Sequence, residues 1–292
     1  MQTTSQKAIE ISVVVPCYNQ EAYIGETLDS VLAQTYTNYE IVVVNDGSRD
    51  ASLSIIQRYA AAHPEKIVVI DQPNQGVVAS RNNAIRAARG KYIYPLDGDD
   101  KIHPECLEKL YAAMQAGKGD VIYSQTEFFG NKNGLFKLPL PTRFNMVRQN
   151  CVVCSALYRK TDWERYGGYS PDFAFNWEDW AFWLNFIDKG QRFYRIDAPL
   201  FLYRQVDNTR NITKGNEATL EHAFKLVKQK FPRLYYLYYL PQIIAKKFER
   251  FARFVYFRCV TSRGRIIIRI FRIPVYYGWD KTASCNKTHP KN

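Results

Sequence analysis

The chain has 292 residues, of which 46% are hydrophobic and 23% are charged. These values fit one large α/β domain with an appendage, and they exclude a fibrous or disordered protein. The formal net charge is +12, and residues 225–275 alone contain thirteen lysines and arginines against one acid, Glu249. The excess charge therefore belongs to the C-terminal part of the chain and not to its general surface.

The first 96 residues alternate short apolar runs with amphipathic segments. The runs at 11–15, 41–44, 67–70 and 92–96 predict strands, and the segments at 21–34, 51–62 and 77–89 predict helices. Fully apolar strands separated by helices favour a mostly parallel central sheet with helices on both faces. Ligands of such sheets bind at the carboxyl ends of the strands. Polar residues follow three of these strands directly, at 16–19, 45–48 and 97–100.

The last of these polar segments is the most informative. Asp97, Asp99 and Asp100 stand within four residues after a strongly β-forming run, where their like charges repel one another. A divalent cation that holds a diphosphate would offset this repulsion, because Mg²⁺ takes one or two carboxylates together with substrate phosphates. The sequence therefore predicts Mn²⁺ or Mg²⁺ as a cofactor.

The regular alternation weakens after residue 120. Residues 128–150 predict a long loop, 151–159 a strand, 162–166 a short helix and 178–189 a helix with an apolar inner face. Cys151 and Cys154 form a C-x-x-C pattern, but no second Cys/His pair lies at zinc spacing. We interpret both as buried free thiols.

The basic C-terminal part also carries an apolar stripe at helical spacing, formed by Ile244, Phe248, Phe251 and Val255. An apolar stripe flanked by lysine and arginine is typical of a helix that lies on an anionic membrane surface. The stripe packing on the main domain is a close second interpretation. Nucleic-acid binding ranks third, because no nucleic-acid motif accompanies the charge.

Seven sequence segments carry a family resemblance. They are Val13-Val-Val-Pro-Cys-Tyr-Asn19, Ser30-Val-Leu-Ala-Gln-Thr-Tyr36, Glu40-Ile-Val-Val-Val-Asn-Asp-Gly-Ser48, Asn74-Gln-Gly-Val-Val-Ala-Ser-Arg-Asn82, Leu96-Asp-Gly-Asp-Asp100, Gly167-Gly-Tyr169 and Glu178-Asp-Trp-Ala-Phe-Trp183. In their order and spacing the chain resembles the inverting glycosyltransferases of family 2, which have the GT-A fold. The resemblance covers residues 11 to about 205. A lone D-x-D would be weak, but the ordered set is specific.

The resemblance implies a site for a UDP-sugar donor. Pro16 and Tyr18 would line the base pocket, and Asp46 would hydrogen-bond the uracil or its ribose. Asp99 would bind the metal directly, and Asp97 would contact the ribose or the metal. The full set assigned to the nucleotide and its diphosphate is Pro16, Tyr18, Glu21, Asp46, Asn74, Arg81, Asp97 and Gly98.

Inverting transfer is a direct displacement, so one general base must take the proton of the acceptor hydroxyl. Asp179 is the predicted base and Glu178 the runner-up, although tandem acids that open a helix are ordinarily favourable N-terminal residues. Asp100 is expected to cap the following helix or to support the site. The family often has a His after a Tyr-Arg pair, whereas here Val206 follows Tyr203-Arg204-Gln205. Two interpretations stay open: water completes the metal site, or this region is out of alignment with the family pattern.

These inferences give a domain plan. Residues 1–220 are the predicted GT-A catalytic domain, with a nucleotide-binding half at about 1–125 and an acceptor-side half at 126–220. Residues 221–280 are predicted to be a basic, amphipathic, membrane-associating helical region, and 281–292 a disordered tail. The polar N-terminus predicts no signal peptide, and the scattered cysteines fit a reducing cytoplasm.

The predicted function is metal-dependent transfer of a sugar from a UDP-sugar to a hydroxyl of a glycan or lipid-linked acceptor, on the inner face of the cell membrane, in bacterial surface-glycan synthesis. One alternative is a catalytically silent module that binds glycans or nucleotide sugars. A sugar-nucleotide pyrophosphorylase is less favoured, because residues 16–21 lack a glycine-rich phosphate loop. No nucleic-acid partner is expected.

Overall fold

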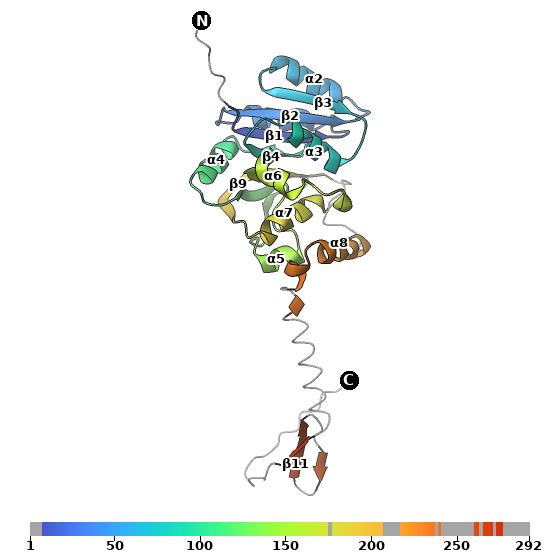
Figure 1. Cartoon of the computed structure of the whole chain (residues 1–292). Helices are drawn as coiled ribbons and strands as arrows, with labels where there is room; N and C mark the ends of the chain where they lie inside the picture. The colour runs from blue at the N-terminus through green and yellow to red at the C-terminus, as the bar shows by residue number, and fades with distance from the viewer. Residues whose placement is uncertain are drawn as a thin grey trace. The chain divides into compact units, whose positions relative to one another are not determined.

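The structure is a computed structural model that describes residues 8–174, 177–206, 217–236, 239–240, 260–262, 265–270 and 273–276. The chain divides into two compact units, Met1–Tyr235 and Tyr236–Asn292. We call them the N-terminal unit and the C-terminal unit and consider each by itself (Figure 1).

The first half of the N-terminal unit confirms the predicted alternation. Its four parallel strands lie in the order β3-β2-β1-β4. They are β1 (Ile11–Cys17), β2 (Tyr39–Asp46), β3 (Ile67–Gln72) and β4 (Tyr92–Pro95), connected by α1 (Ile24–Leu32), α2 (Ser52–Ala62) and α3 (Val77–Ala87). Every residue of β1 and β2 is buried, as expected for central parallel strands. The polar segments that follow β1, β2 and β4 therefore meet at one edge of the sheet.

The second half continues the same sheet with mixed strand directions. The order beyond β4 is β8-β6-β9-β5, and β7 pairs with β6. The strands β6 and β9 are parallel, whereas β8, β5 and β7 run antiparallel to their neighbours. Their bounds are β5 (Lys101–Ile102), β6 (Val121–Gly130), β7 (Gly134–Phe136), β8 (Leu157–Arg159) and β9 (Phe193–Gln205). The sheet is thus mixed and not mostly parallel as predicted, while the predicted α/β class, with a central sheet and helices, is confirmed.

Helices surround this second half. Their bounds are α4 (Cys106–Gln115), α5 (Arg143–Arg148), α6 (Lys160–Tyr166), a 3₁₀ turn (Pro171–Phe173), α7 (Glu178–Asp188) and α8 (Glu217–Lys230). The side chains predicted for the inner face of α7, which are Trp180, Trp183, Leu184 and Ile187, are all buried. Aromatic contacts with Tyr158 on β8 hold the helix in place. The N-terminus of α7 is fixed as a result.

Two local predictions in this half were wrong. The predicted loop at 128–150 contains the end of β6, all of β7 and α5, and the predicted strand at 151–159 is reduced to Leu157–Arg159. Gly130 and Gly134 have positive φ values of 90° and 105°, so they form the turn of a β-hairpin. The Thr142 hydroxyl accepts a hydrogen bond from the Asn145 N–H and so caps α5.

The N-terminal unit extends past the predicted boundary at residue 220. In α8 and the turn after it, Ala223, Val227, Phe231 and Leu234 are buried, so this basic segment packs on the N-terminal unit. In the C-terminal unit, β10 (Val260–Ser262), β11 (Arg265–Ile270) and β12 (Ile273–Tyr276) form an antiparallel sheet. The sequence pattern predicts helix for these residues, and the β-branched run in β11 explains the difference.

Part of the predicted appendage lies outside the described residues. This holds for the apolar stripe at Ile244, Phe248, Phe251 and Val255 and for the predicted tail at 281–292. Among the residues that the structure describes, no helix is both long and apolar enough to span a bilayer.

Candidate functional site

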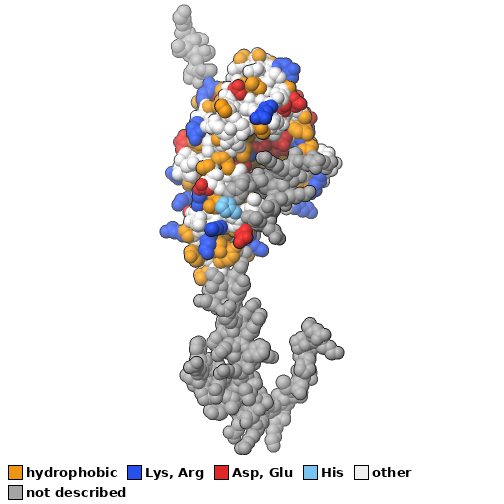
Figure 2. Space-filling view, turned by 90° about the vertical axis from the view of Figure 1, so that its right-hand side faces the viewer, with side chains coloured by type: hydrophobic (Ala, Val, Ile, Leu, Met, Phe, Trp, Pro, Cys, Tyr) orange, Lys and Arg blue, Asp and Glu red, His pale blue; other side chains and the backbone are white. Residues whose placement is uncertain are grey.

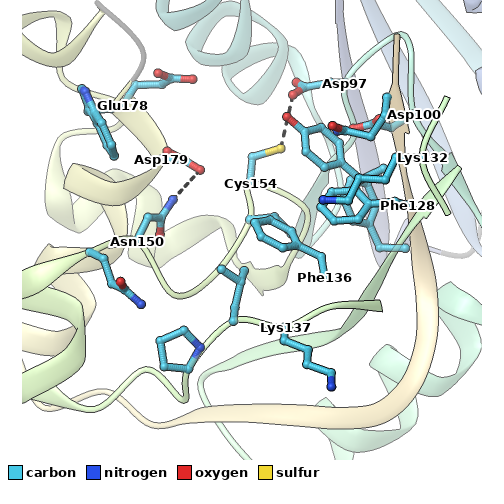
Figure 3. Close-up of a pocket in the computed structure, with 18 of the residues that line it drawn as sticks. Asp97, Asp100, Phe128, Lys132, Phe136, Lys137, Asn150, Cys154, Glu178 and Asp179 are labelled. Carbon is cyan, nitrogen blue, oxygen red and sulfur yellow. Dashed lines mark hydrogen bonds between the residues drawn. The ribbon is translucent and has the colours of Figure 1, made fainter. Parts of the chain in front are cut away.

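A cavity of about 460 Å³ opens in the N-terminal unit. The hairpin of β6 and β7, residues 149–154, the end of β4 and the start of α7 surround it (Figure 3). Figure 2 shows acidic side chains gathered in a hollow on one face of the described chain. The charged and polar residues that line the cavity are Arg81, Asp97, Asp100, Lys132, Lys137, Gln149, Asn150, Glu178, Asp179 and Gln205.

Arg81 on α3 connects the two sides of the site. Its guanidinium is buried and lies 2.6 Å from Asp97 Oδ1 and 2.5 Å from Glu178 Oε1. The resemblance assigns Arg81 to the diphosphate, but here both terminal nitrogens bind carboxylates. Arg81 therefore ties the segment after β4 to the first residue of α7, and the planar guanidinium suits this double contact.

The neighbouring acids Glu178 and Asp179 have different surroundings. Glu178 is buried and paired with Arg81. Asp179 faces the cavity, and its two carboxylate oxygens accept hydrogen bonds from Asn150 Nδ2 (2.8 Å) and the Trp180 N–H (2.7 Å). Burial, together with the charge of Glu178, raises the pKa of Asp179 to about 7. A carboxyl with this pKa can take up and release a proton near neutral pH, as the sequence prediction of Asp179 as base requires.

The three aspartates after β4 differ in their burial and in their contacts. Asp100 is buried and accepts a hydrogen bond from the Arg204 N–H (2.8 Å). It supports the site and does not cap α4, whose N-cap is Glu105. Asp97 is 31% exposed at its side chain. Burial and the charge of Asp97 raise the pKa of Asp99 to about 6, and within the described part of the chain no lysine or arginine side chain forms an ion pair with Asp99.

Asp97 and Asp99 fit a divalent cation. Their carboxylate oxygens are the hard donors that Mg²⁺ and Mn²⁺ prefer, and a cation would offset the charge of Asp97, which after burial is the second cause of the raised pKa of Asp99. The described residues contain no cluster of three His, Cys, Asp or Glu side chains arranged for a metal. A cation held at this pair would thus take its other ligands from phosphate oxygens and water.

Asp46 is engaged by the protein itself. Its Oδ1 accepts hydrogen bonds from Gln72 Nε2 (2.7 Å) and the Gln75 N–H (2.8 Å), and its Oδ2 accepts one from the Gly76 N–H (2.8 Å). Gly76 has a φ of 85°, which favours glycine. Asp46 therefore shapes the turn before α3. The contact with uracil or ribose that the resemblance implies stays a prediction.

The other predicted donor residues lie at the same edge of the sheet. Pro16 is buried in β1, Tyr18 is 46% exposed and Asn74 donates a hydrogen bond to the Asp46 carbonyl. Glu21 binds the Ala51 N–H at the start of α2, and a side chain at Gly98 would collide with Gln20. Only Arg81 and Asp97 of the predicted donor set line the cavity, so most of the cavity lies outside the predicted nucleotide region.

Sequence reasoning expected the 128–150 segment to take part in acceptor recognition, but it did not single out several residues that the cavity brings together. Asn150, which binds Asp179, and Lys132, which lies against Phe128, both come from the segment predicted to be a loop. Cys154 donates a hydrogen bond from its thiol to Asp97 Oδ2 (3.5 Å). A polar residue in an apparent loop has no local signal of its function. The pairing of β6 with β7 places Lys132 at the site, and the segment between α5 and β8 places Asn150 and Cys154 there.

Comparisons with known proteins identify the family of the chain. The model of glycosyl transferase family 2 matches residues 12–180. Glycosyltransferase GlyA of Streptococcus pneumoniae is 35% identical over 51% of this chain, which spans 22% of GlyA. A putative teichuronic acid biosynthesis glycosyltransferase, TuaG of Bacillus subtilis, is 28% identical over 71% of this chain and 84% of TuaG.

Two solved structures share the fold. S. aureus TarS in complex with UDP-GlcNAc has a TM-score of 0.61 and 22% identity, over 73% of this chain and 64% of TarS. The mannosyltransferase PcManGT from Pyrobaculum calidifontis, in complex with GDP-Man and Mn²⁺, has a TM-score of 0.58 and 21% identity, over 80% of this chain and 70% of PcManGT. The family model covers more than half of the chain, in the order of its motifs. The chain therefore belongs to glycosyl transferase family 2, as those motifs predicted.

Proposed function

We propose that the chain is a metal-dependent inverting glycosyltransferase that moves a sugar from a UDP-sugar to a hydroxyl of a glycan or lipid-linked acceptor. One observation carries the proposal. A carboxyl with a pKa of about 7, Asp179, lines the same cavity as Asp97, and Arg81 connects the two sides of that cavity. Family membership supports the reaction class, and the UDP-GlcNAc complex of the structural relative TarS supports the donor nucleotide.

The reaction is a single displacement at the anomeric carbon. The acceptor oxygen forms the new bond to that carbon, while the bond from the carbon to the β-phosphate oxygen breaks and its electron pair leaves with UDP. Asp179 receives the proton of the acceptor hydroxyl. Asn150 and the Trp180 N–H hold the carboxylate in one orientation, which keeps the base aimed at the acceptor.

Asp97 and Asp99 would hold the divalent cation. The cation, when bound, supplies charge compensation for the departing diphosphate. The Mn²⁺ complex of PcManGT supports this choice of metal. Arg81 contributes indirectly, since it sets the position of Asp97 relative to α7.

We further propose that the product is a bacterial surface glycan and that the protein works at the inner face of the cell membrane. The similarity to the teichuronic acid relative TuaG supports the product class. The concentration of positive charge in residues 225–275 supports an anionic membrane surface as a partner.

A screen of UDP-sugars tests the proposal. UDP release is measured with Mn²⁺, with Mg²⁺ and with EDTA, and UDP affinity is measured by calorimetry under the same three conditions. We expect release and tight UDP binding only with a metal, because the carboxylates and the diphosphate otherwise repel each other. Equal UDP affinity with and without metal would remove the metal from the proposal. Metal-dependent binding with no turnover of any UDP-sugar would favour the silent binding module instead.

A further inference from the structure

One wall of the cavity carries two exposed lysines, Lys132 and Lys137. Residues 131–150 contain four basic residues and no acid. Seven residues of this segment line the cavity, namely Lys132, Phe136, Lys137, Leu138, Pro139, Gln149 and Asn150. In Figure 3, Lys132 and Phe128 lie on one side of the cavity, and Asp179 and Glu178 on the other. Asp97 and Asp100 lie on the same side as Lys132 in that view, so the two lysines share the cavity with four carboxyl groups.

The positive charge of this wall is not neutralised by the described part of the chain. Neither Lys132 nor Lys137 forms an ion pair there, and the Lys132 ammonium lies over the Phe128 ring, 4.3 Å from its centroid. The third cation of the lining, Arg81, is already bound to Asp97 and Glu178. The two lysines are therefore placed to meet a negative charge on a ligand.

Aromatic rings form a shelf beside the lysines. The rings of Phe128 and Phe136 lie 4.7 Å apart, and Phe136 and Tyr203 are stacked with 22° between their planes. Phe136 and Tyr203 are partly exposed, and all three rings line the cavity. A flat aromatic surface with a polar edge suits the apolar face of a sugar ring.

We propose that the acceptor is a saccharide that carries an anionic group, a carboxylate or a phosphate, which Lys132 and Lys137 bind while the shelf holds a ring. This deepens the proposed function and rests on it. We assign the anion to the acceptor and not to the donor, because the base Asp179 lines this cavity and only Arg81 and Asp97 of the predicted donor set do so. Lys132 and Lys137 thereby determine acceptor specificity.

The test compares three soluble probes. They are a tetrasaccharide of alternating glucuronate and N-acetylhexosamine, the same tetrasaccharide with its carboxyls reduced to alcohols, and a short glycerol-phosphate oligomer. Affinities are measured by calorimetry with UDP and Mn²⁺ present, for the full chain. We expect at least one anionic probe to bind about tenfold or more tightly than the reduced one, as a charged hydrogen bond provides. Whichever anionic probe binds distinguishes carboxylate from phosphate.

Variants assign the effect to the two lysines. Lys132→Ala with Lys137→Ala should abolish the preference for the anionic probe, and the paired arginine substitutions should retain it. Lys118→Ala, an exposed lysine outside the cavity, is the matched control and should change nothing. UDP affinity should be unaffected in all of them.

Three results would overturn the inference. The first is that no anionic probe binds better than the reduced tetrasaccharide, which includes the case in which none binds. The second is that the double variant loses UDP affinity, which would assign the lysines to the donor. The third is that it loses binding to anionic vesicles and keeps the probe preference. UDP-sugar turnover measured alongside separates this inference from the proposed function, since turnover without a charge preference contradicts only the inference.

Discussion

Two adjacent carboxyl groups, Glu178 and Asp179, show how surroundings assign chemical roles at the scale of single residues. Glu178 is buried, and its Oε1 is bound to Arg81. Asp179 lacks such a cation partner among the described residues, and burial with the charge of Glu178 raises its pKa to about 7. The sequence motif placed both acids at the site, and only the family resemblance favoured Asp179 over Glu178 as the general base. The ion pair supplies a physical reason for the ranking.

Replacing the base should separate binding from chemistry. We expect Asp179→Asn to lower the turnover number by roughly 10²- to 10⁴-fold while UDP affinity stays unchanged, because the amide cannot take a proton. Steady-state UDP release and calorimetry measure the two quantities. Asp197→Asn, an exposed aspartate outside the cavity, is the control. Normal turnover in Asp179→Asn together with a large loss in Glu178→Gln would move the base to Glu178.

The raised pKa of Asp179 also predicts opposite pH trends for activity and stability. The base must be ionised, so kcat/KM should rise with pH and level off above about 7. A carboxyl whose folded pKa lies above its unfolded value of about 3.9 binds its proton more tightly in the folded state. Its stabilising effect is therefore present at low pH and is lost as the pH rises toward 7.

Thermal unfolding measures the predicted change of stability with pH. Thermal unfolding of the wild type and Asp179→Asn is compared at pH 5 and pH 8. We expect the variant to gain melting temperature relative to the wild type at pH 8, by a few degrees at most, and to gain less at pH 5. An equal difference at both pH values would show that Asp179 has an ordinary pKa.

At the scale of elements, sequence periodicity predicted the helices and strands of residues 11–96 well, because each apolar run there becomes a central parallel strand. It failed at 128–150. The strand β7 is a three-residue segment that exists only by pairing with β6, and glycines that looked like loop residues form the hairpin turn. The same pairing brings Lys132 and Phe136 to the site. Long-range contacts that leave no local pattern therefore hid these functional residues from the sequence.

The link between α3 and α7 through Arg81 should be important for stability. Arg81→Met would leave the buried Glu178 without its cation, and we expect a loss of about 3 to 5 kcal/mol in the free energy of unfolding. Urea unfolding measures it. The matched control is Arg195→Met, which breaks a pair whose partner Asp197 is 74% exposed, so its loss should stay below about 1 kcal/mol. Equal losses in the two variants would show that Arg81 has no special structural role.

At the scale of the whole molecule, charge and core are separated along the chain. Residues 225–275 carry a balance of charge equal to that of the entire protein. The buried face of α8 nonetheless belongs to the N-terminal unit, since Ala223 and Val227 are fully buried. The sequence located the change in composition near residue 220, whereas the compact unit ends at Tyr235. Amino-acid composition shows where basic residues are concentrated. It did not reveal that the first basic helix, α8, packs on the N-terminal unit.

This separation predicts that membrane attachment can be removed without loss of the nucleotide site. A truncation after Tyr235 keeps the N-terminal unit whole and removes nine of the thirteen basic residues between 225 and 275. We expect the full chain to float with vesicles that contain anionic lipid and the truncated chain to stay behind, while both bind UDP equally. The reason is that each lysine or arginine near an anionic surface contributes about 1 kcal/mol. Binding should also weaken as salt rises, because salt screens surface charge.

Flotation at low and high salt is the measurement, and vesicles of neutral lipid are the control. Circular dichroism of the truncated chain verifies that the N-terminal unit remains folded, as its separate core implies. A full chain that ignores anionic vesicles would contradict the membrane role. So would a truncated chain that floats as well as the full one, because attachment would then have to come from the N-terminal unit, where the exposed Leu140 and Phe144 lie beside Arg143 and Arg148.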